Sequence, residues 1–160
     1  YALNLLNGKG SEKDYSGALR YFEKACDEKD ATGCDFAGKL LTNCEPAITP
    51  HIGLDTKRGF AYLERGCNLE STAQMFESGE SCYAAAFFAA SGLKGIGKDT
   101  AKAIQLGTRA CEYGNMLGCK LVSDVYSKQG EQKLASQFEA RYKMMEKQLK
   151  DQIELKMGQT

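Results

Sequence analysis

The chain has 160 residues and a mass of 17.5 kDa, enough for one domain or one compact array of repeats. Its 21 basic and 21 acidic residues cancel, so we do not expect the long-range basic field of a nucleic-acid-binding protein. Hydrophobic residues make up 42% of the chain, too many for a disordered protein. The longest apolar run, residues 82–90, is too short to cross a membrane.

The beginning of the chain shows no recognisable leader. Residue 1 is Tyr rather than Met, and no basic segment with an apolar segment behind it follows. We therefore expect that the chain opens inside a helix and that earlier sequence of the protein is missing. No address within the cell can be derived from this end.

Three segments have apolar residues at helical spacing and end at a cysteine. They cover residues 15–26, 57–67 and 100–111. A Gly-x-Gly turn and a Lys-Asp pair precede the first and the third of these segments. The aspartates of these pairs, Asp14 and Asp99, can cap the helices that follow. A shorter helix rich in small residues is expected over residues 81–91, and long loops over 43–55 and 69–80.

Six of the seven cysteines fall into three pairs with similar surroundings. The pairs are Cys26 and Cys34, Cys67 and Cys82, and Cys111 and Cys119. The first and last pairs share the spacing C-x7-C, with Ala-Cys at one end and Gly-Cys at the other, and a polar insertion widens the middle pair by seven residues. This self-similarity predicts an all-α solenoid, an array of stacked helical hairpins.

The repeats divide the chain into an array over residues 1–130 and a C-terminal segment over 131–160. We expect the C-terminal segment to form an amphipathic capping helix and a tail. The hairpins are expected at about residues 1–30, 31–70, 81–113 and 117–145.

The order Gly-x-Gly, Lys-Asp, a helix ending in Ala-Cys, and then Gly-Cys resembles the Sel-1-like repeat in its cysteine-rich form. That repeat builds an α/α solenoid related to the tetratricopeptide repeat. The irregular insertions after Asn43 and Leu69 make the chain more similar to the family of cytochrome c oxidase assembly factor seven (Hcp beta-lactamase-like) than to the evenly spaced bacterial, secreted branch.

This resemblance implies a non-enzymatic scaffold in the mitochondrial intermembrane space. Its role would be in cytochrome c oxidase assembly, or as an accessory subunit of a respiratory complex, and its partners would be respiratory-complex subunits. One alternative is a periplasmic or secreted bacterial protein that binds a host or cell-wall partner. The other is a thiol–disulfide oxidoreductase, although the C-x-x-C motif of such enzymes is absent.

The C-x7-C spacing places one thiol at the end of a helix and the other near the start of the next, which suits a disulfide. We therefore expect all three pairs to be bonded, while buried reduced cysteines are the alternative. Zinc is not expected, because no closely spaced cysteine knuckle occurs. Cys44, which has no partner in the repeat pattern, is expected to be a free thiol.

Two further motifs match only in part. Residues 92–99 come within one residue of a phosphate-binding loop, but Asp99 stands where Ser or Thr would hold magnesium. Ser91 to Lys94 reads S-x-x-K, but the K-T-G of penicillin-recognising enzymes is absent. The resemblance allows haem, yet the single histidine, His51, is expected to be an exposed loop residue. We therefore expect no catalytic residue, metal or cofactor.

The C-terminal segment carries one apolar stripe at helical spacing. Its members are Leu134, Phe138, Tyr142, Met145, Leu149, Ile153 and Met157. The stripe is expected to close the core of the solenoid, and residues 145–157 are expected to extend past it. Met145, Leu149 and Ile153 are therefore candidate partner-binding residues, and the inner helical face of the solenoid is the other candidate surface.

Overall fold

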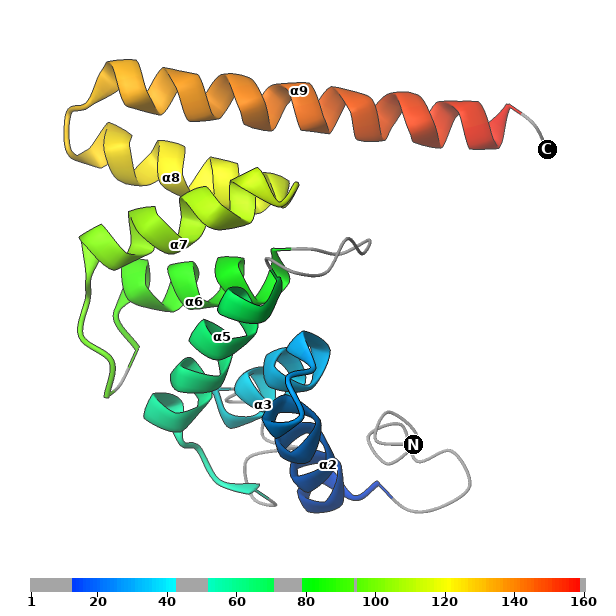
Figure 1. The fold of residues 1–160 in the computed structure, drawn as a ribbon. Coiled ribbons are helices and arrows are strands. Elements are labelled where there is room, and N and C mark those ends of the chain that lie inside the picture. The colour runs from blue at the N-terminus through cyan, green and yellow to red at the C-terminus, as the bar shows by residue number, and fades with distance from the viewer. Residues whose placement is uncertain (1–12, 43–51, 71–78, 94, 159–160) are drawn as a thin grey trace.

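The computed structural model describes residues 13–42, 52–70, 79–93 and 95–158, in which every regular element is an α-helix. The helices are α2 (Tyr15–Asp27), α3 (Ala31–Thr42), α5 (Thr56–Glu70), α6 (Glu80–Ser91), α7 (Thr100–Glu112), α8 (Met116–Lys128) and α9 (Gln132–Met157). They stack in chain order from α2 at one end to α9 at the other (Figure 1). The predicted all-α solenoid is confirmed.

Polar side chains cap three of the helices, and two of these caps, Asp14 and Asp99, were expected from the sequence. Asp14 accepts a hydrogen bond at 2.7 Å from the backbone N–H three residues later, and Asp99 does the same at 2.9 Å. Asn115 caps α8 in the same way at 3.0 Å. Each bond satisfies a backbone donor that the helix itself leaves free, so these caps fix where α2, α7 and α8 begin.

Helix α5 is longer than the 57–67 expected from the sequence, since it continues to Glu70. Its last turn is stabilised by a contact with another helix, which the spacing of apolar residues in the sequence does not reveal. Arg109 of α7 donates a hydrogen bond to the Asn68 side chain at 2.6 Å, and Leu69 is half-buried. Most of the two long loops expected at 43–55 and 69–80 lies outside the described residues, and so do Cys44, Pro46, Pro50 and His51.

The helices form two sets, which we call the A helices (α3, α6, α8) and the B helices (α2, α5, α7, α9). Each A helix packs against the B helix before it and the B helix after it. Helix α6 also contacts α3 and α8, whereas no two B helices make a comparable contact among the described residues. The A helices are therefore the more closely spaced set, and we infer that they line the inner side of the array.

Small residues allow the helices to come this close. Three alanines of α6 pack with Leu63 and Leu106 in one core cluster, and the rings of Phe22 and Phe36 stack at 4.8 Å in a second. At Gly118, an added Cβ would lie only 2.9 Å from the backbone nitrogen of Cys111. Glycine at this position lets α8 cross α7 at the point where the cysteines meet.

Each disulfide joins a B helix to the next A helix. The Cα–Cα distances are 4.5 Å for Cys26–Cys34, 4.4 Å for Cys67–Cys82 and 4.6 Å for Cys111–Cys119. All six cysteines are fully buried. The three bridges thus fix the joins between successive hairpins.

Reduction of the three bridges should destabilise the fold severely. By the loop-entropy formula, a nine-residue loop contributes about 2.6 kcal/mol and a sixteen-residue loop about 3 kcal/mol. The total loss is comparable with the whole stability of many domains, so we expect the thermal midpoint to fall by on the order of 10 °C or more. Circular dichroism in strong reductant checks this, with thiol titration to show full reduction. An unchanged midpoint in the reduced chain would show that packing alone suffices.

The two short turns between disulfide-linked helices follow the same backbone path. In the α7–α8 turn, Gly114 has a φ of +92°, and the N–H that follows it bonds to the Ala110 carbonyl at 2.9 Å. In the α2–α3 turn, Lys29 stands at the equivalent place with a φ of +67°, and the next N–H bonds to the Ala25 carbonyl at 3.0 Å. This left-handed conformation suits glycine and strains lysine.

Lys29→Gly should therefore stabilise the protein. We expect the free energy of unfolding to rise by about 0.5–1 kcal/mol, because the relief of strain exceeds the added entropy of the unfolded chain. Urea denaturation of the oxidised protein measures it. Glu28→Gly is the control, since Glu28 has an ordinary φ of −80° and should show no gain. A loss of stability in Lys29→Gly would contradict this account of the turn.

Candidate interaction surface

The second cysteine of each pair sets the register of its A helix. Positions one and five after that cysteine are four residues apart, so they lie on the same face of the helix. In chain order these positions hold Asp35 and Lys39, Tyr83 and Phe87, and Lys120 and Asp124. We call these six residues the A-layer row. The row was not found from the sequence, although the repeated Gly-Cys could have supplied the register.

Aromatic side chains occupy the centre of the A-layer row. Phe87 is 48% exposed, and its ring centroid lies 6.4 Å from that of the half-buried Tyr83. Phe87 also meets the ring of Phe88 edge-on at 5.8 Å. A large aromatic group that is held by neighbours yet open to solvent is typical of the anchors in protein interfaces.

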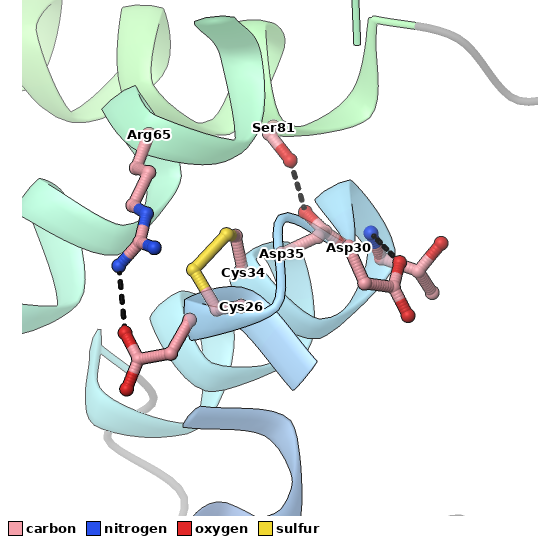
Figure 2. The surroundings of a disulfide bond; sticks show 8 residues. Cys26, Asp30, Cys34, Asp35, Arg65 and Ser81 are labelled. Atoms are coloured by element: carbon pink, nitrogen blue, oxygen red, sulfur yellow. Dashed lines mark hydrogen bonds and ion pairs between the residues drawn. A yellow bond between two sulfur atoms is a disulfide. The ribbon is translucent and has the colours of Figure 1, made fainter. Parts of the chain in front are cut away.

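Charged side chains link α3 to α6 at one end of the row. Lys39 Nζ lies 2.7 Å from Asp35 Oδ2 and 3.5 Å from Glu80 Oε2. The Ser81 hydroxyl donates a hydrogen bond to Asp35 Oδ1 at 3.3 Å, and Figure 2 marks this bond with a dashed line. These contacts hold successive A helices together by polar groups as well as by packing.

The two charges of this pair respond differently to their surroundings. Burial raises the pKa of Asp35, and the hydrogen bond and charge of Lys39 offset only part of that effect. Burial alone would lower the pKa of Lys39, but its contacts with Asp35 and Glu80 raise it. The fold therefore disfavours the charged form of Asp35 and favours the charged form of Lys39.

At the other end of the row, Lys120 contacts two carboxylates. Its Nζ lies 3.0 Å from Asp124 on its own helix and 3.1 Å from Glu139 of α9. Hydrogen bonding to Asp124 and Glu139 raises the pKa of Lys120, and its hydrogen bond to Glu139 lowers the pKa of that carboxyl. At this end of the row, as at the other, the lysine forms ion pairs with two carboxylates.

Arginines make a repeated contact between successive B helices. Arg65 Nη1 donates to Asp27 Oδ1 at 2.8 Å, next to the first disulfide (Figure 2). Arg109 Nη1 donates to Asn68 at 2.6 Å and lies 3.8 Å from Cys67 Sγ. Each arginine stands two residues before a cysteine, and each acceptor directly follows the cysteine of the preceding B helix. The sequence alone did not predict this contact.

The structure separates the three candidate residues of α9. Met145 is half-buried, with its sulfur 3.8 Å from Cys119 Sγ, so it contacts the last disulfide. Leu149 and Ile153 are 44% and 48% exposed. Leu117, Met145 and Leu149 help to line a groove of about 530 Å³ between α9 and the α7–α8 turn. The structure thus offers two surfaces, the A-layer row and this part of α9.

Among the residues that the structure describes, no group of three or more His, Cys, Asp or Glu side chains is arranged to hold a metal ion. Within the same ranges, no helix combines the length and the apolar character that a membrane span requires.

Comparison with known proteins identifies the repeat. The sequence pattern described as the Sel1 repeat matches residues 1–30, 50–71 and 79–115, more than half of the chain. The chain belongs to the Sel1 repeat family. No curated protein matches this Sel1 repeat chain significantly.

Three solved structures share its fold. A protective antigen of uropathogenic Escherichia coli strains, which displays an SLR fold, has a TM-score of 0.71 and 16% identity over 89% of this chain and 29% of that chain. A Sel1 repeat protein from Oxalobacter formigenes has a TM-score of 0.71 and 17% identity over 90% of this chain and 39% of that chain. Helicobacter pylori cysteine-rich protein B has a TM-score of 0.55 and 23% identity over 83% of this chain and 89% of that chain.

This Sel1 repeat chain therefore spans only about a third of the length of the first two proteins. These likenesses support the Sel1 repeat in its cysteine-rich form.

The buried Asp35 of this Sel1 array should make stability depend on pH. Because its pKa is raised in the folded state, the unfolded chain loses this proton first as the pH rises above the ordinary aspartate range. The free energy of unfolding of the wild type should therefore fall relative to Asp35→Asn between the ordinary and the raised pKa. Urea denaturation of both proteins from acid to neutral pH measures the difference. A difference that is constant over this range would contradict the predicted direction.

Proposed function

We propose that this Sel1 repeat chain is a non-enzymatic scaffold that holds another protein on its A-layer row. The observation that carries the proposal is the Tyr83–Phe87 pair, which lies in the middle of three stacked helices in equivalent register. Stacked hairpins create extended inner surfaces of this kind. Such a surface binds by shape and needs no activated acid, base or nucleophile.

The charges of the row indicate the kind of segment that it accepts. At one end Lys39 is paired with Asp35 and Glu80, and at the other Lys120 is paired with Asp124. Because these lysines already have carboxylate partners within the chain, the row has an apolar centre and polar ends. It suits a partner segment with an aromatic or aliphatic group in the middle and polar groups on both sides.

The cysteines support a binding role over thiol exchange. All six paired cysteines are fully buried, whereas exchange requires a sulfur that an attacking thiolate can reach. Three structural bridges also favour an oxidising compartment outside the cytosol.

Two such compartments are proposed for this scaffold. The insertions after Asn43 and Leu69 support the mitochondrial intermembrane space and a role in respiratory-complex assembly. The bacterial origin of the three matched structures supports the periplasm or the cell exterior. Co-purification of the oxidised chain with cytochrome c oxidase subunits would assign the first, and binding only to envelope or host proteins would assign the second.

Phe87→Ala should weaken partner binding by roughly 30-fold or more, because an aromatic anchor contributes about 2 kcal/mol or more at an interface centre. The measurement is titration of the full chain with a partner recovered by cross-linking in the compartment of origin. Tyr21→Ala is the matched control, since Tyr21 is 50% exposed but lies on the B helix α2. We expect less than about a twofold change in this control. Equal effects of the two changes, or no effect of Phe87→Ala, would refute the proposed site.

A further inference from the structure

The residue after the first cysteine differs in charge among the three bridges. It is Asp27 at the first bridge and Glu112 at the third, but it is the neutral Asn68 at Cys67–Cys82, which we call the middle bridge. A carboxylate beside a cysteine opposes the formation of a thiolate there, because like charges repel. At this position, the middle bridge has no such charge.

A cation lies against the middle bridge instead. Arg109 Nη1 is 3.8 Å from Cys67 Sγ, and it donates a hydrogen bond to the neutral Asn68 side chain at 2.6 Å. At the first bridge, Arg65 donates at 2.8 Å to the carboxylate of Asp27, which compensates its charge (Figure 2). A guanidinium beside a cysteine favours the thiolate over the thiol. The charge of Arg109 is therefore available to stabilise a Cys67 thiolate.

The third bridge has a neighbour that cannot stabilise a thiolate. The Met145 sulfur lies 3.8 Å from Cys119 Sγ, and a thioether has neither a charge nor a hydrogen-bond donor. All six bridge cysteines are fully buried, and burial by itself disfavours a thiolate at each of them. Differences in the ease of reduction among the bridges therefore arise from their charged and polar neighbours.

The connections that run beside the bridges also differ. Residues 28–30 connect α2 to α3, and residues 113–115 connect α7 to α8, each in a short turn closed by backbone hydrogen bonds. Residues 71–79 connect α5 to α6. A longer connection constrains its ends less, so opening the middle bridge gives α6 a freedom that α3 and α8 do not gain when their bridges open.

We propose that the middle bridge is a reductive modification site, which a dithiol opens in preference to the two outer bridges, and that its opening loosens α6. One thiolate of the dithiol attacks Cys82 Sγ, the S–S bond breaks, and its electron pair passes to Cys67 Sγ beside Arg109. The second thiolate attacks the sulfur of the dithiol in the mixed disulfide, which releases Cys82 and leaves the dithiol oxidised to a disulfide. Of the two protons of the dithiol, one goes to Cys82 and the other to water.

The two reduced sulfurs already have partners in place. Arg109 faces Cys67 Sγ, and the backbone carbonyl of Cys67 lies 3.6 Å from Cys82 Sγ, so it can accept a hydrogen bond from the thiol formed there. Burial makes the reaction slow, because the attack requires a transient opening of α6. The equilibrium among the bridges depends on the stability of the reduced products and not on that rate.

The site of reduction adjoins the centre of the A-layer row. Tyr83 directly follows Cys82, and Phe87 lies on the same helix. Loosening of α6 should therefore weaken binding at the row, a consequence that rests on the function proposed above. The preference for the middle bridge does not rest on that function.

A redox titration tests the preference bridge by bridge. The full chain is equilibrated with mixtures of reduced and oxidised dithiothreitol at neutral pH, starting from both the oxidised and the reduced protein. Free thiols are then alkylated and located by mass spectrometry. The middle bridge should be half-reduced at a ratio of reduced to oxidised dithiothreitol about tenfold lower than either outer bridge requires, because a hydrogen bond to a charged group is strong. Earlier or simultaneous reduction of an outer bridge would overturn the proposal.

A reciprocal exchange of neighbours tests the cause. Asn68→Asp gives the middle bridge the carboxylate of the first, and should raise the required ratio about fivefold or more. Asp27→Asn retains a hydrogen-bond acceptor for Arg65, and should make the first bridge easier to reduce without affecting the middle one. Arg109→Gln should raise the ratio at the middle bridge, and Arg65→Gln, its matched control, should not. An unchanged middle bridge in Asn68→Asp or Arg109→Gln would overturn the proposal.

Hydrogen exchange tests the loosening of α6. With Cys67→Ala and Cys82→Ala together, the amides of α6 should exchange about tenfold faster relative to those of α8. Cys26→Ala with Cys34→Ala is the control, and it should leave the protection of α6 relative to α8 unchanged. Unaltered protection of α6 in the first variant would contradict the proposal, and so would loss of protection in every helix. Neither measurement uses a partner, so failure of the proposed partner site would not affect either result.

Discussion

The covalent join between the end of each B helix and the start of the next A helix is the constraint on which the rest of this structure depends. With Cα atoms 4.4–4.6 Å apart at each bridge, the two helices cannot slide along one another. At the first and third bridges, glycine beside the second cysteine removes the Cβ that would hold the helices apart, and at the middle bridge Gly66 does so opposite Ser81. The register of every A helix follows from that crossing point, and so does the position of the A-layer row.

Polar contacts refine an arrangement that the bridges establish. On the B helices, Arg65 and Arg109 each reach back to the residue after the preceding cysteine. Between the A helices, the buried Asp35 contacts Ser81, and Lys39 contacts Glu80. Arginine spans the wider gap because its side chain is long and its fork can serve two acceptors. The short side chains of Asp35 and Ser81 can meet because the A helices are closer together.

The two candidate surfaces differ in how the fold produces them. The A-layer row is a product of repetition, because equivalent positions on successive helices fall on one side of the array. The exposed part of α9 results from helix length, because α9 has 26 residues and the helix α8 on which it packs has 13. The first surface suits a different protein with an apolar group at its centre.

The sequence by itself determined the helical class, the caps at Asp14 and Asp99 and the array of hairpins, because helical periodicity, capping residues and repeated cysteine spacing are local signals. It also indicated that the stripe on the last helix would extend past the core. Only the tertiary structure decided that Met145 lies on a disulfide whereas Leu149 and Ile153 are exposed, since that depends on where α8 ends beneath α9. The burial of Asp35 and the last turn of α5 likewise depend on Ser81 and Arg109, which belong to other helices. Contacts between residues that are distant in the chain have no period that a single sequence could reveal.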